Sequence, residues 1–493
     1  MNDFDPDSLD LHQQSFINGA FESSDERTIK VLRPSDGKLI GTFADAGQAG
    51  VDRAVGAAQS ALHESRWSRS APRRRAEIIR RWADLVDLHR VELARIEAAT
   101  SSRPISETLT RDIPAVAELL RFYAECADKT SGEVFETQGD VYSFTRDEPY
   151  GVVGAIAPWN VPLLLATLKI APALAAGNAV VLKPSELTPF SALRLAELSI
   201  EAGLPAGLFS VLVGTGPTTG TALVRHPGVG CITFTGSTRT GIQVMSDAAA
   251  HGLKPVSLEL GGKSPQVVFD DIDSIDQVAT HIAHNLVRNS GQVCFSGTRL
   301  VVQRRVRDQL VEQVVAKLSA ARMGPTWSSA TTLPPIISCQ QASRIKELLE
   351  GAVLQGAELR CGGRVIEKGG ATYVEPTVLV GMSSDADVLL HEVFGPVLTV
   401  ETFDDYDDGI KRAAHPLYGL AAGVYTKDIN KALDAAANID AGTIWINTYG
   451  RTELLNTPFG GFKQSGIGKD FGVAAYRKYR KSKSVVVQVS RPG

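Results

Sequence analysis

Cys294 is the residue whose surroundings best suit a nucleophile. It lies in a stretch of small residues, Asn289 to Gly297, with glycine on both sides. Glycine lets a backbone approach a substrate closely, and a thiolate is a strong nucleophile. The other cysteines lack such a setting, and we expect them to be small, buried hydrophobic residues: Cys126, Cys231, Cys339 and Cys361.

Glu259 closes an apolar strand in the run Leu258 to Lys263. A charged residue at the end of a parallel strand faces either solvent or a ligand, and position alone leaves both possibilities open. Gly262-Lys263-Ser264 is like the end of a P-loop. Ser257 stands where the first glycine of that motif is required, so we expect no Walker site.

Two other segments could hold a nucleotide. At Phe234 to Gly241 a strand turns into a helix, whose free N–H groups favour an anion. Lys183 and Glu186 follow another strand, where the alternative is a solvated loop. A carboxylate there suits a ribose diol and repels a 2′-phosphate, which favours NAD over NADP. The run Gly214 to Gly220 lacks the G-x-G-x-x-G spacing of the common dinucleotide fingerprint.

These residues lie on alternating strands and helices, the pattern of a parallel α/β sheet. We expect helices over Ala71 to Ala99, after Thr188, near Thr218, near Ser237 and over Ile275 to Asn289. We expect strands at Ala179–Leu182, Phe209–Val213, Cys231–Phe234, Pro255–Glu259, Leu300–Val302, Leu398–Val400 and Thr443–Asn447. The predicted fold is α/β, with a Rossmann-like doubly wound parallel sheet, a second α/β unit after Gly262 and a small β element.

Composition excludes several classes of protein. The 493 residues carry 51 basic and 55 acidic side chains, a net charge of −4, so no electrostatic attraction to nucleic acid or an anionic membrane is expected. The five cysteines show no C-x-x-C spacing, so we expect no metal site and no disulfide framework, and a reducing, cytoplasmic location. The N-terminus lacks the pattern of a signal peptide. The apolar run Val161 to Leu182 contains Lys169 and Pro172, which favours a buried helix followed by a strand over a membrane span.

Two segments, Tyr142 to Arg146 and Ser484 to Val489, have the character of edge strands. Neither can bury itself alone, so we expect them to pair with each other or with another subunit. A basic run, Arg477 to Lys483, is expected to be a solvated helix end rather than an anion-binding patch.

Taken together, these segments resemble the aldehyde dehydrogenase superfamily from about residue 17 to the C-terminus. The resemblance rests on seven motifs in the expected order, which begin at Ala157, Lys183, Phe234, Glu259, Gly291, Glu392 and Pro458: APWN, KPSE, FTGS, ELGGK, GQVC, EVFGP and PFGG. It implies a domain for NAD binding at 1–130 and 150–261 and a catalytic domain at 262–462. The segments 131–149 and 463–493 would bridge subunits of a homodimer or homotetramer.

The resemblance implies Cys294 as nucleophile, Glu259 as general base and Asn160 as a donor to the oxyanion. A thiolate that adds to an aldehyde creates an alkoxide, which needs fixed hydrogen-bond donors. The resulting thioester must be hydrolysed, and the presence of Glu259 favours hydrolysis over transfer to coenzyme A.

For the cofactor, the resemblance implies NAD. It places the adenosine ribose at Lys183 and Glu186, the pyrophosphate near Gly236 and Ser237, and the nicotinamide ribose at Glu392. Phe394 and Trp159 would border the nicotinamide. The remaining expected cofactor residues are Ile156, Pro158 and Ser185.

By the same resemblance, the substrate pocket comprises Val161, Leu165, Leu168, Arg288, Phe295, Tyr449 and Arg451, and its channel includes the whole loop from Tyr449 to Leu455. Most of these are apolar, so an apolar or aromatic aldehyde is expected. Arg288 stands where relatives with carboxylate-bearing substrates often carry arginine, which leaves an acidic semialdehyde as the alternative. Leu168, however, stands where their second arginine would be.

Hypotheses of other classes make different demands on the sequence. A thiol hydrolase that uses Cys294 and Glu259 without nicotinamide has no need of Lys183, Glu186, Ser237 and Glu392, which are all present. A non-catalytic protein on this fold would be expected to have lost Cys294, Glu259 or Asn160, and all three are present.

Overall fold

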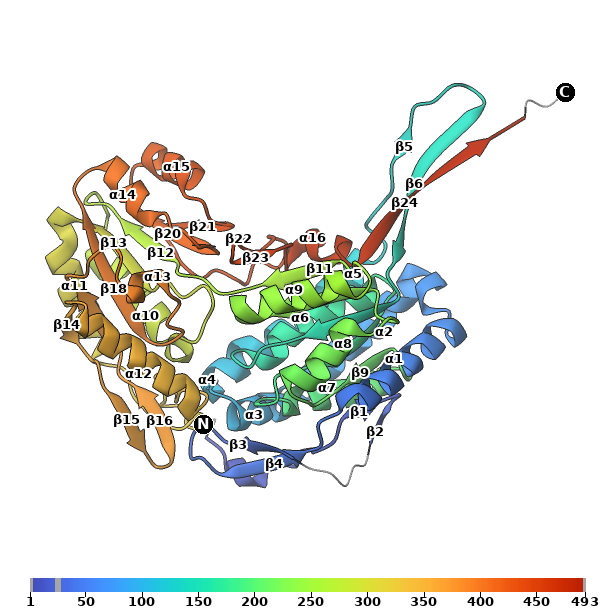
Figure 1. Cartoon of the computed structure of the whole chain (residues 1–493), viewed down its shortest axis with the longest axis horizontal. Helices are drawn as coiled ribbons and strands as arrows, with labels where there is room; N and C mark the ends of the chain where they lie inside the picture. The colour runs from blue at the N-terminus through green and yellow to red at the C-terminus, as the bar shows by residue number, and fades with distance from the viewer. Residues whose placement is uncertain (1–2, 23–27, 491–493) are drawn as a thin grey trace.

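A computed structural model describes residues 3–22 and 28–490 (Figure 1). The larger of its two main sheets has eight strands in the order β2-β1-β9-β8-β7-β10-β11-β23. Their bounds are Phe16–Ile17 (β1), Ala20–Phe21 (β2), Val152–Ile156 (β7), Ala179–Lys183 (β8), Phe209–Val211 (β9), Cys231–Thr235 (β10), Val256–Glu259 (β11) and Gly466–Ile467 (β23). Strands β7 to β11 are parallel, and their order reverses between β7 and β10. At such a reversal, ligands bind beyond the carboxyl ends of the strands.

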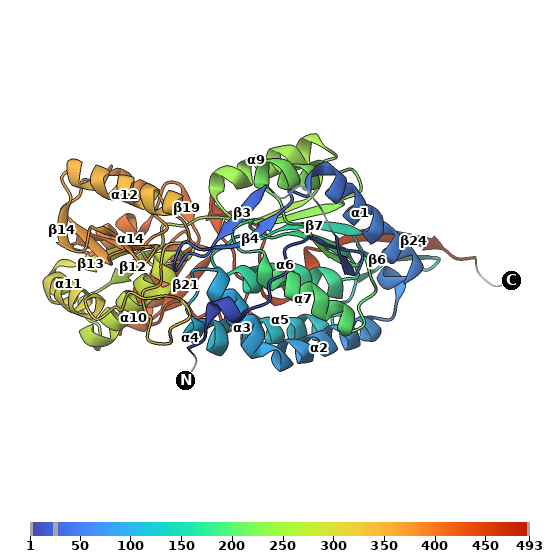
Figure 2. The ribbon, with the colours of Figure 1, turned by 90° about the horizontal axis from the view of Figure 1, so that it is seen from below.

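Helices cover both faces of this sheet. Figure 2 shows α1 and α9 on one side and α2, α3, α5 and α7 on the other. Their bounds are Gly47–Glu64 (α1), Pro72–Leu88 (α2), Arg90–Thr100 (α3), Ile113–Cys126 (α5), Pro162–Ala175 (α6), Phe190–Glu201 (α7), Thr221–Arg225 (α8) and Thr238–Ala250 (α9). The single helix expected over 71–99 is two helices, because the chain turns at His89. The helix expected near Thr218 begins with one wide turn, η4 (Gly216–Gly220), which α8 continues.

The second sheet has seven strands in the order β14-β17-β18-β13-β12-β20-β21. They span Pro265–Val268 (β12), Arg299–Gln303 (β13), Glu358–Cys361 (β14), Thr377–Val380 (β17), Val397–Phe403 (β18), Ala421–Tyr425 (β20) and Thr443–Ile446 (β21). All its pairings are parallel except β14 with β17. Its helices are Ile275–Val287 (α10), Arg304–Leu318 (α11), Cys339–Leu354 (α12), Asp387–Leu390 (α13), Tyr406–Ala413 (α14) and Ile429–Asn438 (α15).

A three-stranded ribbon projects from the body and carries the C-terminal strand (Figure 1). It consists of β5 (Val134–Phe135), β6 (Val141–Pro149) and β24 (Arg480–Gln488). Val485 pairs with Phe144, so the expected pairing of the two edge segments is confirmed. The basic run 477–483 covers the end of α16 (Gly472–Arg477) and the start of β24.

One boundary differs from expectation. Strand β23 lies within the segment 463–493, yet it pairs with β11 in the larger sheet, with Gly466 opposite Glu259. The run 161–182 is helix α6 followed by strand β8, as expected. Within residues 3–22 and 28–490, no helix is long and apolar enough to cross a bilayer.

Candidate active site

Cys294 follows α10 on a tight, left-handed turn. Asn289 and Ser290 have φ values of +47° and +51°, and Gly291 follows at +70°. A side chain on Gly291 would overlap the carbonyl of Gly395, which explains glycine at this position. The turn brings the nucleophile loop against the loop that carries Glu392 and Phe394.

Asn160 lies in the loop between β7 and α6, at the carboxyl edge of the larger sheet. Its side chain is buried, and Nδ2 donates a hydrogen bond to the carbonyl of Gln292 at 3.0 Å. An amide nitrogen carries two hydrogens. The bond to Gln292 therefore fixes the amide's orientation and leaves a second N–H for another acceptor near Cys294.

Glu259 ends strand β11 and is 6% exposed. Its two carboxyl oxygens find no hydrogen-bond partner within residues 3–22 and 28–490. Burial, together with the charge of Asp470, raises the pKa of Glu259 well above its usual value, although Lys478, Lys169 and Lys469 oppose this. A buried carboxyl without a partner is costly for stability, and such groups gather at functional sites.

The thiol of Cys294 is perturbed in the same direction. Burial raises its pKa to about 12, and the carboxylates of Glu392 and Glu259 add to the effect. The backbone N–H groups of Phe295 and Cys294 partly oppose it. The thiol therefore keeps its proton at neutral pH in this arrangement.

One cavity, here called the Cys294 cavity, collects much of the predicted site. Nine of the predicted residues line it: Pro158, Trp159, Asn160, Leu165, Gly236, Ser237, Cys294, Glu392 and Phe394. Five residues that sequence reasoning missed also line it: Thr235, Leu260, Gly261, Gln341 and Arg344. Thr235 lies within the FTGS motif, and Leu260 and Gly261 lie within ELGGK, so the sequence offered a signal for them. It offered none for Gln341 and Arg344 on α12.

Helix α12 holds the loop of Glu392 in place. Gln341 Nε2 donates to the carbonyls of Val393 and Phe394, and Arg344 Nη2 donates to the carbonyl of Glu392 at 2.9 Å. Phe394 has a φ of +54°, a conformation that a bulky residue adopts only when its surroundings impose it. Burial raises the pKa of Glu392 to about 7, although its hydrogen bond from Gly262 N opposes the shift.

The predicted nucleotide residues lie along the carboxyl edge of the larger sheet. Ser237 caps α9 and accepts from Thr240 N, and a side chain on Gly236 would come within 2.5 Å of the Phe234 ring. Lys183 Nζ lies 2.9 Å from Glu186 Oε2. Ile156 and Ser185 lie beside them, at the end of β7 and just after β8.

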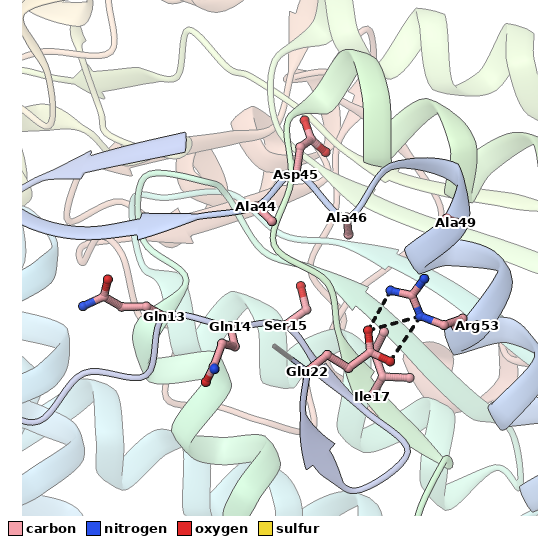
Figure 3. Close-up of a pocket in the computed structure, with 10 residues that line it drawn as sticks. All are labelled: Gln13, Gln14, Ser15, Ile17, Glu22, Ala44, Asp45, Ala46, Ala49 and Arg53. Atoms are coloured by element: carbon pink, nitrogen blue, oxygen red, sulfur yellow. Dashed lines mark hydrogen bonds and ion pairs between the residues drawn. The ribbon is translucent and has the colours of Figure 1, made fainter. Parts of the chain in front are cut away.

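The run Gly214 to Gly220, to which the sequence assigned no function, is held in place by hydrogen bonds to Asp45. The Asp45 carboxylate accepts hydrogen bonds from Thr215 N and from the hydroxyls of Thr215, Thr218 and Thr219. Burial opposes these bonds, yet they hold the pKa of Asp45 below its usual value. Asp45 also borders a polar cavity beside α1, in which Arg53 pairs with Glu22 (Figure 3).

A second cavity also borders α6, at Leu164, and is here called the entrance cavity. It is lined by Thr110, Arg111, Pro114, Ala115, Glu118, Leu164, Thr452, Glu453, Leu455 and Phe471. Thr452, Glu453 and Leu455 belong to the channel loop 449–455 that the resemblance implies. The other seven were not predicted, and five of them come from the η3 turn (Thr108–Asp112) and α5, which carry no recognisable motif.

The remaining predicted substrate residues are dispersed. Tyr449 is buried and its hydroxyl donates to the Phe295 carbonyl at 2.8 Å, whereas Arg451 is exposed and pairs with Glu453 at 2.7 Å. Leu168 is buried in the core around α6, and Val161 precedes that helix.

Arg288 is 7% exposed, and its Nε has no hydrogen-bond acceptor in the part of the chain that the structure describes. That atom lies 3.7 Å from Glu107 Oε2, and the guanidinium lies 5.8 Å from the centre of the Phe295 ring. Burial lowers the pKa of Arg288 to about 10.

Comparison with known proteins places this geometry in a known group. The sequence profile described as the aldehyde dehydrogenase family matches residues 21–485. Retinal dehydrogenase 2 of Gallus gallus is 38% identical over 97% of this chain and 92% of its own length. An aldehyde dehydrogenase of Enchytraeus buchholzi is 39% identical, over 96% of this chain and 95% of its own. A crystal structure of indole-3-acetaldehyde dehydrogenase with NAD⁺ superposes with a TM-score of 0.96, at 39% identity and 98% coverage of both chains.

Proposed function

Because the chain belongs to the aldehyde dehydrogenase family and oxidises aldehydes to carboxylic acids, we propose that Cys294, Asn160 and Glu259 perform this oxidation. The observation that carries the proposal is the Cys294 cavity. There the thiol and the Asn160 amide lie together with Glu392 and Phe394.

In the first step, the Cys294 sulfur bonds to the aldehyde carbon while the thiol proton passes to solvent water, and the carbonyl oxygen takes the electron pair of the C=O π bond to become an alkoxide. The free N–H of Asn160 and the backbone N–H of Cys294 donate to that oxygen. Fixed donors of this kind act where charge develops, and the loss of one typically costs about 10²–10³ in rate.

The residues along the sheet edge suit NAD, which solved relatives bind. Gly236 leaves room beside Phe234, the start of α9 offers N–H groups to a pyrophosphate, and Lys183 with Glu186 suits a ribose. Glu392 and Phe394 would border the nicotinamide, which when bound supplies the hydride acceptor of the oxidation. We expect NAD to be preferred over NADP, because Glu186 repels a 2′-phosphate.

In the last step, Glu259 removes a proton from a water molecule, whose oxygen attacks the thioester carbon on Cys294. The carbon–sulfur bond breaks, the carboxylic acid leaves and the thiol regains its proton. Glu259 suits this task because its oxygens are not engaged by hydrogen bonds in the described structure. Its raised pKa makes it a stronger base than an ordinary glutamate.

We propose an apolar or aromatic aldehyde as substrate. From Phe295, the residue after Cys294, the rings of Phe295, Trp445 and Tyr449 pack in series. Leu164, Leu455 and Phe471 line the entrance cavity. Such walls select substrates by burial of apolar surface.

One observation favours a second candidate, an acidic semialdehyde. Among the described residues, buried Arg288 has no acceptor for Nε, and Arg111, which borders the entrance cavity, makes one weak hydrogen bond, to Thr452 at 3.4 Å. Two arginines with spare donors could hold a carboxylate.

The projecting ribbon suits contact with a second copy of the chain. It exposes Val134, Tyr142 and Val486, which are 82%, 59% and 67% exposed. An exposed apolar strand edge is costly unless it is covered. We propose a homo-oligomer, for which light scattering should give a multiple of the monomer mass, reduced in Val486→Lys. All five cysteines are unpaired, which suits a reducing, cytoplasmic compartment.

The experiment that tests the function is NADH formation from NAD and a panel of aliphatic, aromatic and carboxylated aldehydes, repeated with NADP. We expect most activity with NAD and an apolar aldehyde. Cys294→Ala should lose NADH formation and retain NAD binding. NADH formation that persists in Cys294→Ala would refute the assignment of Cys294 as the nucleophile.

A further inference from the structure

Asn289 joins the nucleophile loop to the loop of Asn160. Its side chain is fully buried, and Nδ2 donates to the backbone carbonyl of Asn160 at 2.8 Å and to that of Gln292 at 3.3 Å. The carbonyl of Gln292 is the same group that accepts from Asn160 Nδ2. Asn289 therefore holds both the main chain of Asn160 and the acceptor that orients its side chain.

The orientation of the Asn289 side-chain amide is itself fixed by Ser102 and Gln292. Ser102 Oγ donates to Asn289 Oδ1 at 3.1 Å, so the amide oxygen faces the hydroxyl and Nδ2 faces the two carbonyls. Gln292 Nε2 donates to the Asn289 carbonyl at 2.9 Å and lies 3.3 Å from Ser102 Oγ. Together with Asn160, whose Nδ2 donates to the Gln292 carbonyl, these residues form a buried network.

The backbone conformation of Asn289 indicates that holding its side chain in this position costs free energy. Its φ of +47° lies in the left-handed region, which non-glycine residues adopt at a cost in free energy. Asparagine is among the residues that tolerate this conformation best. Its amide can also donate to two carbonyls while accepting from a hydroxyl, a combination that aspartate and leucine lack.

We propose that Asn289 is a positioning residue that aims the free N–H of Asn160 at the substrate oxygen. The inference rests on the proposed role of Asn160. Cys294 lies on the loop that Asn289 begins, and Asn160 lies on a loop of the other sheet. The two Nδ2 bonds of Asn289 thereby set the distance between the nucleophile and the oxyanion donor.

The test is a double-mutant cycle read by the rate of the first NADH formed per active site. Alone, Asn160→Ala should lose about 10²–10³ in this rate. Asn289→Ala should lose about 10², the cost of an oriented group displaced by about 1 Å. In the Asn160→Ala background, Asn289→Ala should change the rate by less than about threefold, because residues that act as a unit are not additive.

Asn178→Ala is the matched control. Asn178 is also fully buried, its Nδ2 donates to the carbonyls of Ala173 and Tyr479, and its Oδ1 accepts from Gly151 N. It precedes β8, away from the carboxyl edge of the sheet. It should lower the melting temperature as Asn289→Ala does and leave the rate of the folded protein within about twofold.

If Asn289→Ala does not fold, Ser102→Ala takes its place in the cycle. It removes only the hydroxyl that orients Asn289, and should slow the rate by about three- to tenfold, an effect that Asn160→Ala should abolish. If the rate losses of the two single variants multiply in the double variant, the positioning role of Asn289 is overturned, and the proposed role of Asn160 is not. A full rate in Asn160→Ala would overturn the proposed oxyanion donor and this inference with it.

Discussion

The ring of Trp159 meets the ring of Phe394 edge-on, with centroids 5.3 Å apart and an interplanar angle of 89°. Trp159 follows a strand of the larger sheet, and Phe394 precedes a strand of the second. The Cys294 cavity is therefore lined by two contacting residues that are more than two hundred positions apart in the chain.

Gln341 supports this contact, because its Nε2 donates to the carbonyls of Val393 and Phe394, which lie in the peptides before and after Phe394. We predict that Gln341→Ala raises the KM for NAD about three- to tenfold, which corresponds to the loss of one or two hydrogen bonds. Steady-state kinetics with NAD as the varied substrate measure this. Gln340→Ala, on the neighbouring exposed position, should leave the KM unchanged.

The raised pKa of Cys294 predicts a pH profile for chemical modification. Only the thiolate is alkylated, and its fraction rises about tenfold for each pH unit below the pKa. With a pKa of about 12, the alkylation rate of the free enzyme by iodoacetamide should climb from pH 7 to pH 9 without a plateau. A plateau near pH 7 would show that the thiol is ionised before cofactor binds.

Asp45 should act on the cofactor without touching it. Asp45→Asn replaces an acceptor of the threonine hydroxyls by a partial donor, so the turn Gly216–Gly220 beside Lys183 loosens. We predict a KM for NAD raised about three- to tenfold and a kcat within about twofold. Asp52→Asn, at an exposed aspartate on α1, the helix that follows Asp45, is the control. A lower kcat in Asp45→Asn would argue against an effect on binding alone.

Arg288 separates the two substrate classes. Glu107 remains paired with Arg103 at 2.5 Å, so Arg288→Leu leaves no unpaired acid behind. If the substrate is apolar, kcat/KM of Arg288→Leu should stay within about threefold of that of the parent enzyme. If Arg288 holds a substrate carboxylate, kcat/KM should fall about 10- to 100-fold, because charged hydrogen bonds to the substrate are lost. The ratio of kcat/KM for an aromatic and a carboxylated aldehyde measures the difference.

The sequence predicted the parallel sheets well, because their strands are continuous apolar runs between glycine and proline turns. It also predicted the pairing of the two edge segments, since neither could bury itself. It missed the break at His89, where the apolar stripe continues unchanged through the turn. It also missed the pairing of β23 with β11, because a two-residue strand carries no periodicity.

Within the site, the motif residues that line the Cys294 cavity were named from the resemblance. Gln341 and Arg344 could not be named, since they lie on α12, whose pattern is that of an ordinary surface helix. Arg111 could not be named either, since it lies in the η3 turn, which carries no recognisable motif. Their roles depend on which loop the fold places against them. Asp45 and Asn289 were hidden for the same reason, because their partners are distant in the sequence.

The most direct test of the paired roles of Cys294 and Glu259 is the NADH burst of Glu259→Gln. The account predicts rapid formation of at most one NADH per active site, followed by a stall, because the thioester on Cys294 forms but its hydrolysis lacks a base. The control is Cys294→Ala, which should give no burst. Sustained turnover by Glu259→Gln at the parent rate would contradict the account.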